Sequence, residues 1–586
     1  MYRLIQLYTQ AEMTGHCLVS WLQNHAHTLP MSAAVVVGFM QSQNRGLTQW
    51  KWRITPSPRA TLKSSPCSSC ALKEPLATTK NGTVVGLRNV AYDQDLFLGI
   101  PFAQPPVADL RYRRPRSVNQ TWKRLPAKSY GAWPHGVRPG SKLPVLVSIY
   151  GGALREGGSA DQRYNSSLIV QQSVKTGSPT VFVSFNYRPS GFGFLPGSPL
   201  VESGNANLGF YNQRLALHWV QDNIAAFGGD PSRVTIQGES AGAISLGAHF
   251  LAFGGRDDAL FHGGIAQSGG PVSLAGFTFP EQQDALYQDV LDSTSCAGVN
   301  DTLQCLRGQP VETLKSLFQG KQYFPVIDND IIVNTSIAQL EASDFVRRPL
   351  LIGTNKNEGT PFAHGGNIGI GLNTSQDLLN LVHARDAAQN LSNDTAIKIA
   401  NAYLVNLTDA ELADALGTVS PSPAPRYGTL YGRATTLLGD LTFEAGRRRG
   451  AQIWTQFNVP VYSYRFDVVP NGVDRTIFGA AHYSDIGFMF NNVDGLGFSI
   501  NPLDSPSVEI KQSFRSLAEQ MTNQWIAFAT KLSPNMYHNP SVAWPLYGNG
   551  TGNVMVLRLN GSSVVSDTWR HDSISRIIDA VLELRS

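Results

Sequence analysis

One stretch, "RVTIQGESAGAIS" at residues 233–245, constrains the fold of this chain more than any other. Val234 and Ile236 alternate with polar residues, as in a strand, and the residues after the glycines are typical of a buried helix. A strand, a tight reversal and a helix in this order hold the hydroxyl of Ser240 clear of its own backbone. The unpaired N–H groups of the helix N-terminus then point at any oxyanion formed there. The alternative is an ordinary glycine turn with a bystander serine.

Strands and helices alternate along most of the chain. Nearly continuous apolar runs at residues 144–150, 180–187, 348–354 and 460–466 predict buried strands, and the apolar face of residues 213–227 predicts a helix between two of them. Such strands, interleaved with helices, indicate an α/β fold with a large, mostly parallel central sheet and helices on both faces. Catalytic groups of such sheets lie at the carboxyl ends of the strands, where Ser240 also lies.

Composition excludes several classes of protein. A hydrophobic content of 42% supplies a large core for 586 residues, and a net charge of +4 with no long basic run does not indicate nucleic-acid binding. The apolar run at residues 33–40 is too short to span a bilayer, although it suits a degraded secretion signal that begins at Met31. The "CSSC" motif, Cys67 to Cys70, has no second pair nearby to complete a zinc site.

Two domains of unequal character are predicted. Residues 1–75 lack periodicity and are expected to form an N-terminal extension, whereas residues 76–586 form one catalytic domain. Cys296 and Cys305 would close a short loop in an otherwise cysteine-free body, which suits a disulfide and an extracellular location. N-glycosylation sequons also favour secretion, and they begin at Asn81, Asn119, Asn165, Asn300, Asn334, Asn373, Asn390, Asn393, Asn406, Asn549 and Asn560.

A serine nucleophile needs a base to take its proton and an acid to orient that base. Glu358 stands in "NKNEG", directly after the predicted strand at 348–354, and His482 stands in "FGAAHYSDIGFMF", after the strand at 460–466. Either residue alone is ordinary, because loop glutamates are usually solvated and most histidines are structural. Their order along the chain, serine then acid then histidine, and their positions after successive strands predict a catalytic triad of Ser240, Glu358 and His482.

Backbone N–H donors for the oxyanion are expected from two places. Ala241 begins the helix after Ser240, and "YGGA" at the end of the strand at 144–150 offers Gly152 and Ala153. The alternative for "YGGA" is a plain turn that ends a strand.

Several stretches together resemble the type-B carboxylesterase/lipase family, the cholinesterase-like branch of the α/β-hydrolases. They are "FLGIPFAQPPVADLRYRRP", "VSFNYR", "NLGFYNQRLALHWVQDNIAAFGGDPSRVTIQGESAGA", "NKNEG", "GAAHYSDIGFMF", "NQWIAFA" and "WPLY". The resemblance runs from about residue 80 to the C-terminus. It implies the α/β-hydrolase fold, the triad and oxyanion donors named above, and a Cys296–Cys305 bond in the place of the family's second disulfide.

Three features depart from the family. Only 21 residues separate Trp122 from Pro144, where relatives carry a Cys-bounded loop and a "SEDCL"-like strand. Sheet strands, and the loop that forms a lid in the lipases of the family, are therefore expected to be absent. The first 75 residues are also unlike the family. Finally, Ala153 replaces the third glycine, and a positive φ there would strain it by about 1 kcal/mol.

The resemblance implies a secreted serine carboxylic-ester hydrolase that acts on a small-molecule or lipid ester and needs no metal or organic cofactor. A triacylglycerol lipase or sterol esterase of the same family is the closer alternative. A non-catalytic, cholinesterase-like adhesion protein is the alternative from another class, because a protein can keep a fold after it has lost the catalytic function. The central block argues against a serine peptidase.

Overall fold

The computed structural model describes residues 74–129, 133–136, 142–272, 276–364, 371–386, 391–535 and 542–583. The N-terminal extension expected at residues 1–75, with its apolar run and "CSSC" motif, lies outside this part of the chain except for its last two residues. No helix of the described residues has the length and apolar character needed to cross a membrane.

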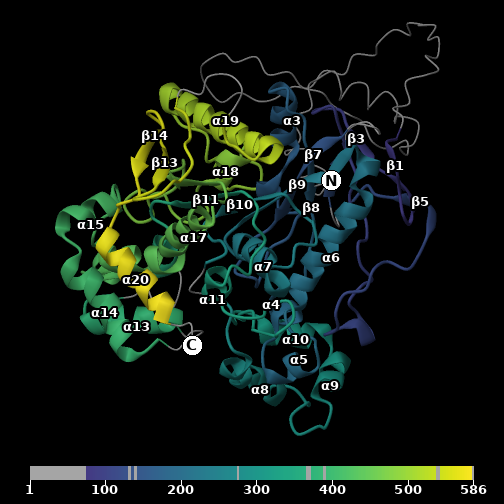
Figure 1. Ribbon diagram of the computed structural model, residues 1–586, viewed down its shortest axis with the longest axis horizontal. Helices are drawn as coiled ribbons and strands as arrows, with labels where there is room; N and C mark the ends of the chain where they lie inside the picture. The colour runs from purple at the N-terminus through teal and green to yellow at the C-terminus, as the bar shows by residue number, and fades with distance from the viewer. Residues whose placement is uncertain are drawn as a thin grey trace, which may run out of the picture. The chain divides into compact units, whose positions relative to one another are not determined.

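The described residues form a twisted central sheet of eleven strands (Figure 1). Every neighbouring pair from β13 through β12, β11, β10, β9 and β7 to β8 is parallel, whereas β14 at one edge and β6, β4 and β3 at the other pair antiparallel. In spatial order the strands are β14 (Ser563–Ser566), β13 (Asn553–Leu557), β12 (Val461–Phe466), β11 (Leu350–Asn355), β10 (Gly263–Gln267), β9 (Gly229–Glu239), β7 (Leu143–Ile149), β8 (Val181–Ser184), β6 (Trp133–Gly136), β4 (Gln94–Leu96) and β3 (Leu87–Asn89). The mostly parallel sheet predicted from the sequence is confirmed.

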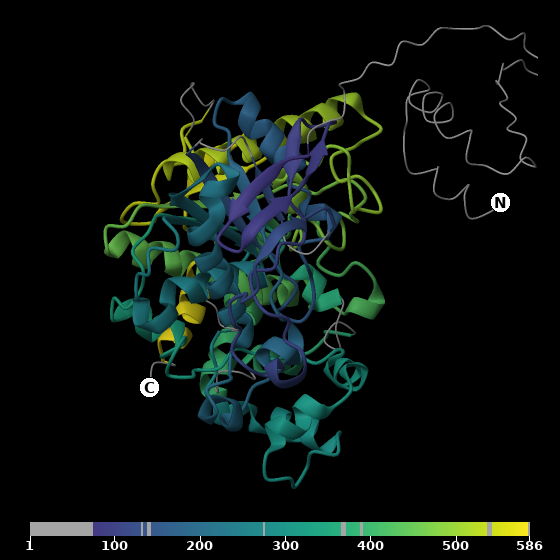
Figure 2. The same ribbon diagram turned by 90° about the vertical axis from the view of Figure 1, so that its right-hand side faces the viewer.

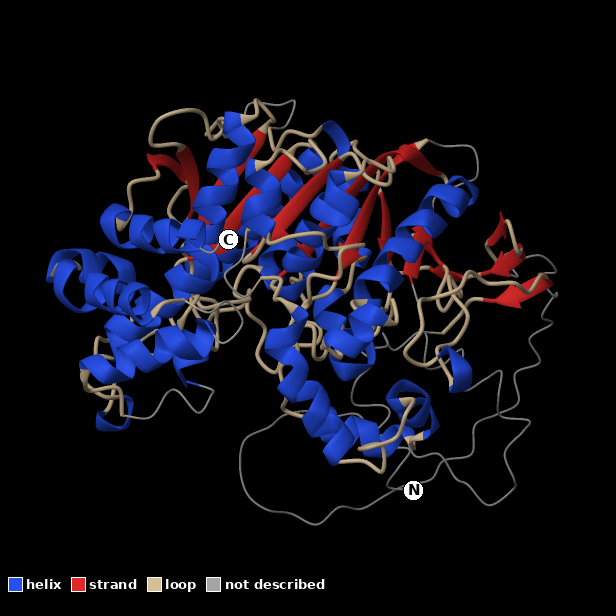
Figure 3. Ribbon diagram, turned by 60° about the horizontal axis from the view of Figure 1, so that its bottom comes forward, coloured by secondary structure: helices blue, strands red, loops and turns tan. Residues whose placement is uncertain are grey.

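Helices cover both faces of the sheet (Figure 3). One face carries α3 (Ser167–Lys175), α18 (Ile486–Met489) and α19 (Val508–Lys531), and the other carries α6 (Leu208–Asn223), α7 (Ala241–Gly255) and α17 (Ala445–Gln456). The strands supply alternate side chains to these two layers. Val145 and Val147 of β7 pack into the core beneath α7, while Leu146 between them packs into the core beneath α19. This alternation is the period of an extended strand buried on both faces.

The remaining elements surround this central body. A second sheet joins β1 (Leu76–Thr79), β2 (Gly82–Val85) and β5 (Trp122–Pro126), and its purple strands face the viewer in Figure 2. The other helices are α4 (Ser190–Phe194), α5 (Ser198–Glu202), α8 (Asp284–Asp292), α9 (Thr302–Gly308), α10 (Val311–Phe318), α11 (Ser336–Glu341), α12 (Thr360–His364), α13 (Ser375–Asp386), α14 (Asn393–Asn401), α15 (Asp409–Leu416), α16 (Tyr431–Gly439) and α20 (His571–Glu583).

The short segment between Trp122 and Pro144 still supplies strands to the fold. Its residues 122–126 form β5, and its residues 133–136 form β6, which lies between β8 and β4 in the main sheet. Sheet strands were expected to be absent from this segment, and the presence of β5 and β6 corrects that expectation. A four-residue strand fills the position because ladder hydrogen bonds involve only backbone groups.

The expected disulfide between Cys296 and Cys305 is present. It joins the segment after α8 to α9, and Gln309, just beyond α9, donates from Nε2 to the sulfur of Cys296 at 3.4 Å. Arg307 at the end of α9 donates to the carbonyl oxygens of Arg111 and Tyr112, at 2.9 and 3.1 Å. The disulfide thus fixes the helix that holds residues 111 and 112.

Removing this bond should lower the stability of the folded chain. A closed loop of this length contributes about 2–3 kcal/mol through the entropy of the unfolded state. We expect the Cys296→Ala/Cys305→Ala double variant, and the parent protein in dithiothreitol, to melt at a lower temperature. The double variant is its own control, because dithiothreitol should not lower its melting temperature further. A parent protein with free thiols at both positions, found by alkylation and mass spectrometry, would contradict the pairing.

Candidate active site

Ser240 occupies a strained turn between β9 and α7. Its φ of 56° and ψ of −123° lie in a region that side chains other than glycine rarely adopt. The backbone holds it there, because its N–H donates to the carbonyl oxygen of Gln267 at 2.9 Å and its own carbonyl accepts from Ala243 and Ile244 at 2.9 and 3.0 Å. The strain is compensated by surrounding structure, as is common at functional sites.

The two glycines that flank the serine are required by close backbone packing. A Cβ atom added to Gly242 would lie 2.1 Å from the carbonyl oxygen of Ile149, and one added to Gly238 would lie 2.3 Å from the carbonyl carbon of Gly242. Both distances are far below van der Waals contact. The glycine pattern around Ser240 therefore reflects the fit of α7 against β7 and β9, and the turn is the elbow that the sequence predicts.

Glu358 and His482 come together at the carboxyl ends of β11 and β12. His482 Nδ1 lies 2.6 Å from Glu358 Oε2, and only 12% of the histidine side chain and 3% of the glutamate side chain are exposed. An isolated parallel bridge between Asn357 and Ala481 ties the two loops together next to this pair. The ring of Phe443 stacks on the imidazole, with centroids 4.6 Å apart.

The other carboxylate oxygen of Glu358 is held by two groups that the sequence analysis did not identify. The hydroxyl of Ser268 donates to Oε1 at 2.6 Å, and the backbone N–H of Asn355 donates to it at 2.5 Å. These two hydrogen bonds fix the position of the Glu358 carboxylate. Asn355 is the last residue of β11, and Ser268 directly follows β10. Their positions at the carboxyl ends of two strands were the only sequence signal that could have predicted these contacts.

A second carboxylate also contacts the histidine. His482 Nε2 lies 3.2 Å from Glu239 Oε1, and Glu239 is the residue immediately before the serine. Burial lowers the pKa of His482, but the negative charges of Glu239 and Glu358 outweigh it and raise that pKa to about 9. Burial also raises the pKa of Glu239, to about 8. His482 and Glu239 are in contact, so a proton shared between these two residues is held mainly on the imidazole.

The predicted oxyanion turn lies beside the elbow. β7 pairs with β9 in parallel so that Ile149 aligns with Gly238, which brings the "GGA" turn to the level of Ser240. A Cβ atom added to Gly151 would lie 3.2 Å from the Cβ of Ser240. Gly152 and Ala153 have φ values of 101° and 57°, so the alanine does adopt the left-handed conformation that was expected to strain it.

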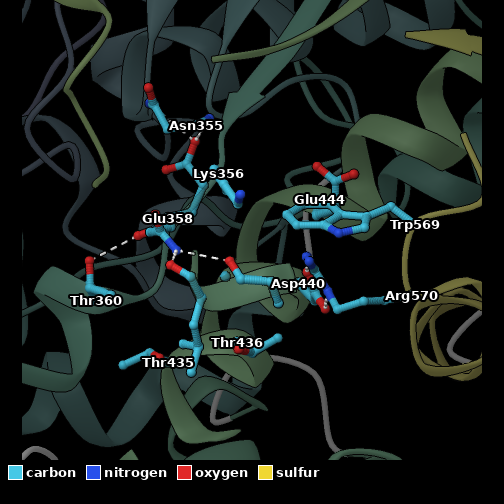
Figure 4. A pocket seen from close by; sticks show the side chains of 14 residues that line it. Asn355, Lys356, Glu358, Thr360, Thr435, Thr436, Asp440, Glu444, Trp569 and Arg570 are labelled. Atoms are coloured by element: carbon cyan, nitrogen blue, oxygen red, sulfur yellow. Dashed lines mark hydrogen bonds and ion pairs between the residues drawn. The ribbon is translucent and has the colours of Figure 1, made fainter. Parts of the chain in front are cut away.

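Buried polar contacts made by residues of the C-terminal part of the chain lie next to the loop that carries Glu358. A cavity of about 10 Å³, room for one water molecule, is lined by Glu358, Asp440, Glu444 and Arg570 among others (Figure 4). Arg570 Nε donates to Asp440 at 2.7 Å, and Glu444 accepts at 2.6 Å from the hydroxyl of Thr354, which precedes the acid loop in β11. The carboxylates of Asp440 and Glu444 both have partners, so we interpret this cluster as structural support for the loop that carries Glu358.

A cavity of about 450 Å³ opens beside the histidine. His482 and Tyr483 line it together with Phe478, Phe498 and Ile500. A largely apolar cavity of this size is suited to an organic ligand. Among the described residues, no group of histidine, cysteine, aspartate and glutamate side chains is arranged to hold a metal ion.

Comparison with known proteins places this geometry in a family. The model of the carboxylesterase family matches residues 73–135 and 132–574. The chain belongs to the carboxylesterase family. The two matched stretches meet and overlap at residues 132–135, within the short segment from Trp122 to Pro144.

Individual relatives agree with this assignment. Secreted lipase 1 of Botryotinia fuckeliana is 30% identical over 556 residues, which cover 83% of this chain and 89% of the relative. Lipase 1 of Geotrichum candidum is 29% identical over 569 residues, which cover 82% and 91% of the two chains. As a member of the carboxylesterase family related to these lipases, the chain is a serine carboxylic ester hydrolase.

The fold has a solved counterpart. The crystal structure of Aspergillus niger EstA superposes with a TM-score of 0.74 at 24% sequence identity, covering 88% of this carboxylesterase and 99% of EstA. Together with the parallel sheet covered on both faces, this likeness shows the α/β-hydrolase fold.

Replacing Glu239 tests the electrostatics of the histidine. Only neutral His482 can accept a proton, so kcat/KM should rise with pH as the imidazolium deprotonates. Glu239→Gln removes a negative charge that favours the imidazolium, and the rising limb should move to lower pH by about one to two units. Glu509→Gln, at an exposed position in α19, is the matched control and should leave the profile unchanged. An unchanged profile in Glu239→Gln would show that this carboxylate is uncharged while the enzyme works.

Proposed function

We propose that this carboxylesterase cleaves its substrate through an acyl-enzyme on Ser240, with His482 as the general base and Glu358 as the acid that orients it. The observation that carries the proposal is the 2.6 Å contact between His482 Nδ1 and Glu358 Oε2 next to a serine held in a strained elbow. The contact fixes the imidazole with Nδ1 toward the acid. That orientation leaves Nε2 as the nitrogen available to the serine.

The chemistry follows from these positions. His482 Nε2 takes the proton of the Ser240 hydroxyl as its oxygen attacks the ester carbonyl, and the tetrahedral oxyanion accepts hydrogen bonds from backbone N–H groups. The imidazolium returns the proton to the departing alcohol, which leaves an acyl-serine. Water, deprotonated by the same nitrogen, then releases the carboxylic acid and regenerates the serine. We assign the N–H groups of Gly152, Ala153 and Ala241 to the oxyanion.

In the described structure His482 Nε2 faces Glu239, and this nitrogen makes no hydrogen bond with the Ser240 hydroxyl. Catalytic hydrogen bonds are often long before substrate binds and shorten in the reacting complex. Rotation about one side-chain bond of Ser240 changes the position of its oxygen without moving the backbone. The carboxylate of Glu239 then stabilises the imidazolium that forms when the serine gives up its proton.

The triad variants should separate the three roles. Ser240→Ala should abolish hydrolysis of p-nitrophenyl butyrate, with a loss of several orders of magnitude and an unchanged circular dichroism spectrum. His482→Gln should be nearly inactive, and Glu358→Gln should be impaired less predictably because it orients and stabilises the base. Ser516→Ala and His571→Gln change exposed residues of the same types and serve as controls. A Ser240→Ala variant that retains a tenth of the activity would refute the assignment and favour a non-catalytic role for the elbow.

The substrate class is proposed from the relatives. Those reported above are named lipases, so a lipid ester such as a triacylglycerol is the second candidate beside a small soluble ester. The reacting groups are the same for both. Rates on p-nitrophenyl butyrate in solution and on a tributyrin emulsion, measured with one preparation, distinguish an esterase from a lipase.

We also propose that the chain is secreted, with residues 1–75 as an extension before the catalytic domain at 76–586. The Botryotinia relative is named a secreted lipase, and the family match begins at residue 73. Most of the sequons are accessible to glycosylation, because their asparagines are exposed, at positions 119, 300, 334, 373, 393, 406, 549 and 560.

Expression in a eukaryotic host tests this location directly. We expect the protein in the culture medium, and treatment with an endoglycosidase should reduce its mass because several exposed sequons carry glycans. Asn334→Gln and Asn406→Gln should each remove one glycan. Protein that stays in the cell lysate and shows no mass shift would contradict secretion.

A further inference from the structure

A third cavity, larger than the two described above, has a lining separate from the triad. It measures about 770 Å³, within the range of ligand-binding pockets, and none of its lining residues belongs to the triad or to the proposed oxyanion donors. Its wall is mainly apolar and includes Phe102, Pro106 and Phe192. Val107 and Val311 at its edge are 63% and 48% exposed, so apolar surface is open to solvent there.

The charged residues of this cavity are all positive. Arg111 and Arg188 line it, and no aspartate or glutamate appears among its described lining residues. Arg188 donates from Nε to the amide oxygen of Asn212 at 2.8 Å and from Nη2 to the carbonyl oxygen of Arg113 at 3.0 Å, and both acceptors are uncharged. Arg111 likewise donates to the carbonyl oxygens of Arg307 and Gln309. Neither guanidinium has an anionic partner in the described structure.

Two hydrogen-bond donors at the cavity lack acceptors. Tyr112 is only 1% exposed, and its hydroxyl has no partner among the described residues. Arg188 Nη1 is also buried without a partner. Leaving such groups unpaired in an apolar environment is costly, and the cost is greatest for a charged group. Burial lowers the pKa of Arg188 to about 10, so the group still carries its charge at neutral pH.

We propose that this cavity binds a long-chain carboxylate, with its head group at Arg188 Nη1 and the Tyr112 hydroxyl and its alkyl chain along the apolar wall. A carboxylate offers two oxygens, one for each unpaired donor, and it neutralises a buried guanidinium. The alkyl chain covers the surface of Phe102 and Phe192. The proposal does not depend on hydrolysis at Ser240, although a fatty acid released there has the same chemistry as one taken from solution.

Isothermal titration of the Ser240→Ala protein with dodecanoate, below its micellar concentration, tests the proposal without turnover. We expect saturable binding that weakens about fourfold for each methylene removed between dodecanoate and octanoate, as buried alkyl chains do. 1-Dodecanol, which has the same chain and no charge, should bind at least about tenfold more weakly, because a hydrogen bond to a charged group is lost. Equal binding of the acid and the alcohol would overturn the head-group assignment.

Variants locate the binding in this cavity. Tyr112→Phe removes a hydroxyl that has no partner, so the protein should fold normally while its affinity for dodecanoate falls about tenfold. Tyr323→Phe is the matched control, because its hydroxyl is also buried without a partner but the residue does not line the cavity. Val311→Trp fills the exposed edge and should weaken binding independently. No binding of dodecanoate, or equal affinity in Tyr112→Phe, Tyr323→Phe and Val311→Trp, would overturn the proposal.

Discussion

The parallel pairing of β7 with β9 determines where Ser240 and its proposed oxyanion donors lie. With Ile149 aligned to Gly238, the backbone of the serine elbow passes so close to the end of β7 that a single added carbon at Gly242 would overlap a carbonyl oxygen at 2.1 Å. The same pairing places the glycine turn after β7 at the level of Ser240. The serine and its proposed oxyanion donors are therefore set by one strand register.

The proposed acid and base depend on a second register, that of β11 with β12. The two strands end together, the bridge between Asn357 and Ala481 continues their pairing, and Glu358 meets His482 directly beyond it. Charge then decides the chemistry of the imidazole. Two buried carboxylates favour its protonated form, which suits a base that must hold a proton between attack and departure of the alcohol.

Sequence reasoning succeeded where the fold depends on local rules. The elbow and the buried strands follow from glycine sterics and from side-chain alternation. The assignment of Ser240, Glu358 and His482 as a triad stays a prediction, although the folded sheet brings Glu358 and His482 into contact. Sequence reasoning missed Ser268 and the contact from Glu239, because both depend on distant segments that only the folded sheet brings together. It also expected lost strands in the short segment after Trp122, where the four residues of β6 are enough to pair with both β8 and β4.

The central claim is that Ser240 is the one nucleophile and that His482 activates it. An alkyl phosphonate with a p-nitrophenol leaving group reacts covalently with an activated serine, and peptide mass spectrometry identifies the residue that carries it. The account predicts one phosphonate per chain, on Ser240, with a labelling rate that falls by orders of magnitude in His482→Gln. A label on another residue, or an unchanged rate in His482→Gln, would contradict it.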